Sequence, residues 1–143
     1  VAGPEAGTTI TPVSGSGQTI TAAAAKETFV FEPTAGYGNT NANTITGFSP
    51  PNDMLDFTKA FLETHTTTDS LVTSLTSGTV TASQLISGAG TTAASNGNQL
   101  FIYNSTNGKL YFDADGNTGG ESAALVATLT GAPTITFNDI SVT

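Results

Sequence analysis

Apolar residues alternate with hydroxyl-bearing and other small polar residues in short runs along most of this chain, and glycine, asparagine, serine and proline separate the runs. Successive side chains of a strand point to opposite faces, so alternation of this kind predicts half-buried strands. We expect strands at 8–11, 18–21, 28–31, 44–48, 100–103, 109–112, 125–129 and 134–137. Proline at position 33 is expected to end the third of them, because it cannot continue a hydrogen-bonded ladder.

The spacing of apolar residues changes after the Pro-rich stretch at 49–53. Met54, Phe57 and Phe61 recur at helical intervals, which predicts a short helix over 53–63 with Asn52 or Asp53 as its N-cap. A second helical turn is expected at 81–86. The whole pattern predicts an all-β fold, resembling a β-roll or β-sandwich, with one or two short helices.

The composition limits the classes of molecule that this chain is expected to bind. The chain has 143 residues, 3 basic against 11 acidic side chains and a net charge of -8. Nucleic acid and anionic membrane surfaces attract positively charged proteins, so neither is an expected partner. The absence of cysteine excludes disulfides and thiolate chemistry. No stretch is long and apolar enough to predict a membrane-spanning helix.

The candidate chemistry lies in the loop that follows the predicted hairpin at 100–112. Asp113, Asp115 and Asn117 alternate there, and Glu121 follows four residues later. Oxygen ligands at alternating positions suit a hard cation such as calcium. An EF-hand is excluded, because position twelve of the loop is Ala124. The alternative is a polar loop whose Asp and Asn side chains bond to their own backbone.

Other candidate sites are weaker. Asp53 and Asp56 are carried as secondary calcium ligands, with helix capping as the alternative. His65 is the sole histidine, and it has no nucleophile-elbow motif or cysteine beside it, so we expect it in an exposed loop. With no recognisable nucleophile, base or cofactor motif, the chain is not expected to be an enzyme.

Three segments together resemble the C-terminal region of RTX (haemolysin-type calcium-binding) proteins. The ETFVF run at 27–31 is similar to a strand that closes the family's glycine-rich repeats. The stretch at 44–57 resembles the segment that follows. The stretch at 100–128, which begins LFIYNSTNGKLYFDADGN, resembles the family's late hairpin. The GGxGxD repeat itself does not occur, and Gly47 stands where the family has an aspartate. The resemblance implies Thr/Gly-rich lead-in strands at 1–26 and a C-terminal cap and secretion domain at 27–143.

The resemblance also implies a function. Such regions belong to proteins exported by a type I secretion machinery, and they fold outside the cell in calcium. The final residues Asp139, Ile140, Ser141, Val142 and Thr143 are similar to the tail of the secretion signal, with a last strand of the sheet as the alternative. We therefore expect a secreted, extracellular or cell-surface, non-catalytic domain with calcium as its cofactor. The alternative is a surface-layer or adhesin module that associates with itself or binds a cell-surface glycan.

Overall fold

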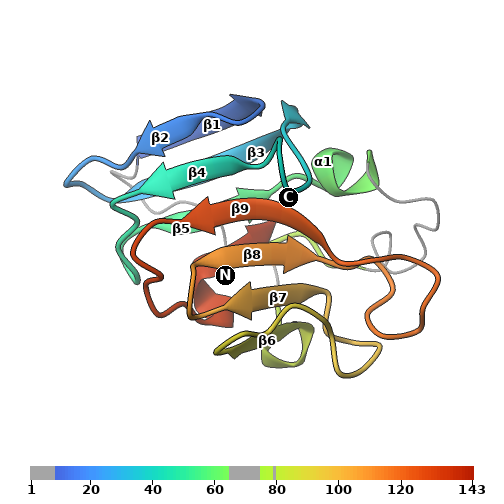
Figure 1. Ribbon diagram of the computed structural model, residues 1–143. Helices are drawn as coiled ribbons and strands as arrows, with labels where there is room; N and C mark the ends of the chain where they lie inside the picture. Colours follow the sequence, from blue (N-terminus) through green and yellow to red (C-terminus); the bar gives the residue numbers. More distant parts are fainter. Residues whose placement is uncertain (1–8, 65–74, 79) are drawn as a thin grey trace.

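The chain forms two β-sheets that lie over each other, with a short helix at one end (Figure 1). The computed structural model describes residues 9–64, 75–78 and 80–143. The elements in chain order are β1 (Thr9–Gly15), β2 (Thr19–Thr21), β3 (Glu27–Ala35), β4 (Asn43–Thr46), β5 (Met54–Phe57), α1 (Lys59–Glu63), a 3-10 turn (Ala82–Gln84), β6 (Leu85–Gly88), β7 (Phe101–Asn104), β8 (Lys109–Phe112), β9 (Ala124–Leu129), a second 3-10 turn (Phe137–Asp139) and β10 (Ile140–Val142).

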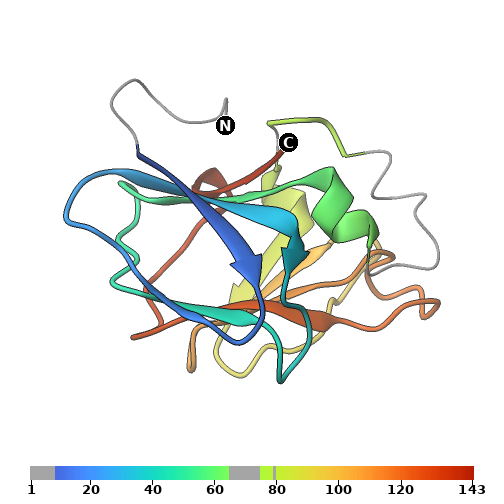
Figure 2. The same ribbon diagram turned by 90° about the horizontal axis from the view of Figure 1, so that it is seen from above.

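The first five strands alternate between the two sheets. One sheet has the order β1-β3-β5-β10, and all its neighbours are parallel. The other has the order β2-β4-β9-β8-β7-β6, in which β8 runs antiparallel to β7 and β9 while the remaining pairs are parallel. Figure 2, seen from above, separates the two layers. Both sheets therefore begin with a strand from the first 21 residues.

The prediction of an all-β roll or sandwich is wrong. The fold is mixed and α/β-like: the residues that the structure describes are 39% strand and form one wholly parallel sheet, one mixed sheet and a single short α-helix. The alternation of apolar and polar residues has the same period of two in parallel and antiparallel strands. That alternation therefore located most of the strands without revealing how they pair.

The helix expected over 53–63 is in fact a strand followed by a helix. β5 occupies 54–57, and α1 begins only after Thr58, whose hydroxyl accepts a hydrogen bond from Phe61 N at 3.1 Å. Leu55 and Phe57 are both fully buried, which is the period of a strand. Over so few positions, apolar residues three apart are compatible with a helix or a strand. Residues 54–57 form a strand because they pair with β3 and β10.

The predictions of a helical turn at 81–86 and of a strand at 134–137 also differ from the structure. Thr81 does begin a helical turn, but only over 82–84, and 85–88 continues as β6. The strand expected at 134–137 is absent: the second 3-10 turn begins at Phe137, and the last strand is β10. β3 also continues past Pro33, because a bulge between its pairings with Val13 and Gly15 releases residues 32–34 from the ladder.

Phenylalanine rings fill the space between the sheets. Phe57 stacks on Phe31 with ring centroids 4.5 Å apart, and it contacts Phe61 of α1 at 6.1 Å. Across the interface it lies 5.5 Å from Phe101, which in turn lies 5.3 Å from Phe112. Both layers and the helix thus meet at one ring.

Phe57→Ala should therefore lower the free energy of unfolding by about 3–5 kcal/mol, since it removes a fully buried ring and leaves a cavity. Ile10→Ala is the matched control, because Ile10 is 49% exposed and its loss should change stability by about 0.5 kcal/mol or less. Urea denaturation followed by circular dichroism measures both. Equal effects of the two substitutions would contradict this account of the core.

Candidate metal site in the 113–121 loop

A tight hairpin of β7 and β8 immediately precedes the acidic loop at 113–121. β7 and β8 lie at the predicted positions, with Phe101 opposite Phe112 and Asn104 opposite Lys109. Gly108 has φ +74°, and a Cβ there would lie 1.9 Å from Leu129 O, so only glycine fits this turn. The hairpin therefore fixes the place where β8 ends and Asp113 begins the loop.

The loop is anchored on the turn at 95–98. Gly116 has φ +62°, and its backbone approaches so closely that a Cβ would lie 2.6 Å from Asn96 O. Asn117 donates a side-chain hydrogen bond to Ser95 O at 2.9 Å. The structure therefore places Asn117 against a neighbouring loop, where its amide nitrogen is occupied.

Asp115 organises the second half of the loop through one carboxylate oxygen. Its Oδ2 accepts hydrogen bonds from Gly120 N at 2.6 Å, Thr118 Oγ1 at 2.8 Å and Glu121 N at 3.0 Å. The Thr118 hydroxyl and these backbone N–H groups hold the pKa of Asp115 below its usual value. Its other oxygen, Oδ1, is buried and has no hydrogen-bond partner while Asp113 is ionised.

Asp113 lies beneath this loop and is 5% exposed. Burial raises its pKa to about 6, and a hydrogen bond from its protonated form to Asp115 adds to the rise. The negative charges of Asp115 and Glu121 also raise the pKa of Asp113. The Asp115 N–H, which donates a hydrogen bond to Asp113 Oδ1 at 3.4 Å, opposes this rise. With its pKa near 6, the Asp113 carboxyl is protonated below about pH 6 and ionised at neutral pH when no cation is present.

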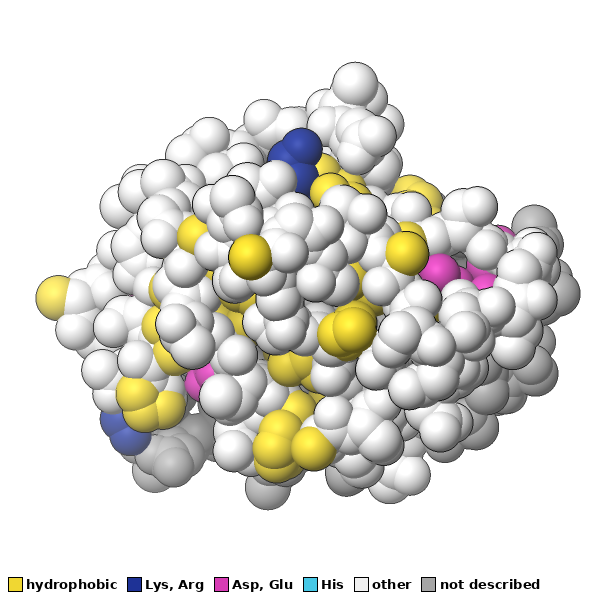
Figure 3. All heavy atoms as spheres, turned by 60° about the horizontal axis from the view of Figure 1, so that its bottom comes forward, with side chains coloured by type: hydrophobic (Ala, Val, Ile, Leu, Met, Phe, Trp, Pro, Cys, Tyr) yellow, Lys and Arg dark blue, Asp and Glu magenta, His cyan; other side chains and the backbone are white. Residues whose placement is uncertain are grey.

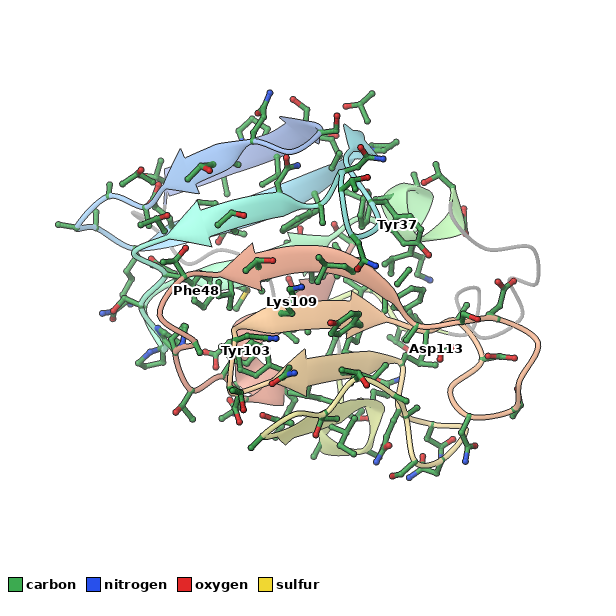
Figure 4. All side chains as sticks on the ribbon, in the orientation of Figure 1. Tyr37, Phe48, Tyr103, Lys109 and Asp113 are labelled. Carbon is green, nitrogen blue, oxygen red and sulfur yellow. The ribbon has the colours of Figure 1, made fainter. Side chains whose placement is uncertain are left out.

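Tyr37 also belongs to this cluster. It follows β3, and its pKa is raised by burial and then by the charges of Glu121 and Asp113. Figure 3 shows acidic side chains gathered at the right edge of a face with few charges, and Figure 4 places Tyr37 and Asp113 at the same end of the sheets. The sequence gives no local signal for this tyrosine, because 76 positions separate it from Asp113 and only the pairing of strands brings the two together.

The loop fits calcium in part. The buried Asp115 Oδ1 without a partner and the neighbouring Asp113 carboxylate are suitable oxygen ligands, and Glu121 lies near enough to add negative charge. Calcium takes six to eight oxygens, and within 9–64, 75–78 and 80–143 no cluster of three or more His, Cys, Asp or Glu is arranged to hold a metal. Asp113 and Asp115 would therefore hold the ion, with backbone carbonyls and water supplying the remaining oxygens.

The secondary candidates Asp53 and Asp56 lie elsewhere and are occupied by other donors. Asp53 accepts hydrogen bonds from Glu27 N at 3.1 Å and Ser49 N at 2.9 Å, so it closes a turn and does not cap a helix. Asp56 accepts from the hydroxyls of Ser141 and Thr143 at 2.8 and 2.9 Å. Burial raises the pKa of Asp53, the Ser49 and Glu27 N–H groups oppose the rise, and the charge of Glu27 adds to it.

The residues of the expected secretion tail form part of the core. Ile140, Ser141 and Val142 make up β10, are fully buried and pair in parallel with β5. Asp139 closes the preceding turn by accepting from Thr136 N at 2.7 Å. The alternative of a last strand is thus the arrangement in the folded chain, whatever role the tail has before folding.

Comparison of the chain with protein-family models, with curated proteins and with solved structures found no match in any of the three. The resemblance to RTX proteins therefore stays a prediction from the residues quoted above. No helix among the described residues is long and apolar enough to cross a membrane. His65 lies outside the described residues.

The Asp113 pKa makes stability depend on pH in the absence of a cation. A folded-state pKa of about 6, above the ordinary 3.8, contributes stability that is complete below about pH 4 and is lost as the pH rises through 6. In chelator, raising the pH from 4 to 7 should cost the wild type about 1–2 kcal/mol more than it costs Asp113→Asn. Urea denaturation at each pH measures the difference.

Glu63→Gln, at the exposed end of α1, is the control and should follow the wild type. If Asp113→Asn and Glu63→Gln show the same pH profile, the Asp113–Asp115 pair does not hold a proton in the folded protein.

Proposed function

We propose that this chain is a non-catalytic domain of an exported RTX-type polypeptide that folds outside the cell when its 113–121 loop binds calcium. The observation that carries the proposal is the buried Asp113 beside an Asp115 oxygen that has no hydrogen-bond partner. At neutral pH the Asp113 and Asp115 carboxylates repel each other, and a bound divalent cation reduces this repulsion. Calcium then stabilises the folded state by binding to it and not to the unfolded chain.

The burial of the C-terminal strand supports a separation of export from folding. An exporter that recognises residues 139–143 needs them as a free segment, whereas the folded chain buries 139–142 and pairs β10 with β5. Folding before export would hide the signal. A folded state that depends on calcium keeps the tail accessible in the cytosol, where calcium is scarce, and buries it outside.

A self-associating surface module has less support. β1 is an edge strand, and Thr9 N donates to Lys26 O, so its odd-numbered residues bond to β3 and its even-numbered residues face the free edge. Pro12 stands in the middle of that edge and offers no N–H. Proline at this position is a usual means of preventing edge-to-edge pairing between copies.

Calcium should raise the melting temperature of the wild type at pH 7, because ligand present at one hundred times its dissociation constant adds about 2.7 kcal/mol. Asp115→Asn and Asp113→Asn should each reduce that calcium-induced rise, and the double variant should abolish it. Differential scanning fluorimetry in calcium, in magnesium and in chelator measures the increments. An equal rise in the Glu63→Gln control and in the double variant would remove calcium from this loop.

Export tests the tail separately from the metal. In a bacterial host that expresses a type I secretion system, deletion of residues 139–143 should abolish appearance of the chain in the medium. Phe57→Ala, which impairs folding but leaves the tail intact, should be exported at least as well as the wild type. Wild-type export after the deletion would refute a signal in these residues, and failure of both variants would show that folding, not the tail, governs export.

A further inference from the structure

Three short segments with threonine at both ends lie side by side on the outer face of the mixed sheet. They are Thr19-Ile20-Thr21 in β2, Thr44-Ile45-Thr46 in β4 and Thr128-Leu129-Thr130 at the end of β9. The three strands are neighbours and run in the same direction, as Figure 1 shows. Segments from three distant parts of the sequence therefore present the same pattern on one surface.

The threonines are in register across the strands. Thr19 pairs with Thr44 and Thr44 with Thr128, which makes one row. In the second row Thr21 pairs with Thr46, and the Thr46 and Thr130 hydroxyl oxygens lie 3.4 Å apart. The result is a grid of two rows and three columns, which we call the threonine lattice: Thr19, Thr21, Thr44, Thr46, Thr128 and Thr130.

The middle residue of each segment fixes the direction of the threonines. Ile45 and Leu129 are fully buried, and Ile20 packs against the same core. Because neighbouring side chains of a strand point to opposite faces, the threonines point outward. Thr19, Thr21 and Thr130 are exposed, and Thr44, Thr46 and Thr128 are half-buried.

The backbone positions of the lattice are regularly spaced, and in one corner the Thr46 and Thr130 hydroxyl oxygens approach each other to 3.4 Å. Strands in a sheet lie about 4.8 Å apart, and alternate residues of a parallel strand repeat after about 6.6 Å. Branching at Cβ restricts χ1 of threonine, so each position offers a methyl and a hydroxyl group with little rotational freedom. Backbone ladders hold this spacing before any partner arrives.

The chemistry of the lattice excludes the common kinds of partner. None of its six side chains is charged or aromatic, so it offers neither an ion-pairing site nor a ring on which a sugar can stack. Lys109, opposite Thr128 on β8, marks its border, and Figure 4 shows Lys109 at that place.

We propose that the threonine lattice binds the surface of ice. A partner that gains from a grid without a pocket must itself repeat in two directions, and the two repeats of the lattice are close to spacings between oxygen atoms on the faces of ice. The hydroxyl groups hydrogen-bond to lattice water, and the methyl groups favour an ordered water layer beside them. The proposal is independent of calcium binding in the 113–121 loop.

Ice binding is measured directly with the whole chain. The wild type should shape growing ice crystals, inhibit recrystallisation and enter a slowly growing ice hemisphere. Thr44→Tyr, which places a bulky ring at the central column, should reduce the fraction of protein in ice about tenfold, equivalent to about 1.4 kcal/mol. Thr92→Tyr is the matched control in an exposed loop away from the lattice, and it should match the wild type.

Two further variants keep the test decisive. Thr19→Tyr lies on the exposed edge strand β2, so it blocks a corner of the lattice where the fold tolerates bulk. Thr44→Ser removes the methyl group and Thr44→Val the hydroxyl group, and each should weaken ice binding. Unchanged melting temperatures show that the variants fold.

Exclusion of the wild type from ice, or ice binding that survives both Thr44→Tyr and Thr19→Tyr, would overturn the proposal. Sedimentation with crystalline cellulose or chitin is the parallel arm. Binding there without binding to ice would assign the lattice to a solid polysaccharide and would equally overturn it.

Discussion

The two sheets face each other across a column of phenylalanine rings, and the packing of these rings fixes the positions of the strands and of α1. Phe57 lies between Phe31 of its own sheet and Phe101 of the other, and it contacts Phe61 of α1. A close-packed interior of this kind fixes the distance and rotation of the two layers. The loop after β8 and the outer face of β2, β4 and β9 are both positioned by strands whose inner side chains are buried in this core.

The same core explains where the acidic residues lie. Glu27, Asp53, Asp56 and Asp139 are each at most 5% exposed, although buried carboxylates are costly. Donors of the chain itself compensate for the cost: Thr11 donates to Glu27, the Ser141 and Thr143 hydroxyls to Asp56, and backbone N–H groups to Asp53 and Asp139. Asp113 is different, because its neighbours include two further carboxylates. That contrast is the reason for placing the cation in the 113–121 loop and not at Asp53 or Asp56.

Most of the strands were predictable from the sequence, although β5 and β6 were expected as helical segments, and the partners of the strands were not predictable. The hairpin of β7 and β8 follows from aromatic runs on either side of an Asn-Gly turn, which is local information. Parallel pairing of β5 joins it to β3, 26 positions earlier, and to β10, 85 positions later, and no local pattern encodes it. The same limit applies to the site: Asp113 and Asp115 were identified from their spacing, whereas the approach of Tyr37 and the anchoring of Asn117 on Ser95 required the fold.

The C-terminal strand connects the folding of the chain with the export proposed above. β10 contributes two fully buried side chains, Ile140 and Val142, and the hydroxyl that Ser141 gives to Asp56, so the sheet is incomplete without the last residues. A linear signal in these residues is readable only while that sheet is unformed. In the export route proposed above, the free energy that closes the sheet becomes available after passage through the exporter, and a cation bound at Asp113 and Asp115 outside the cell would supply it. The acidic pair follows β8 and the buried tail forms β10, and both features are accounted for by the proposal that the domain folds only after export.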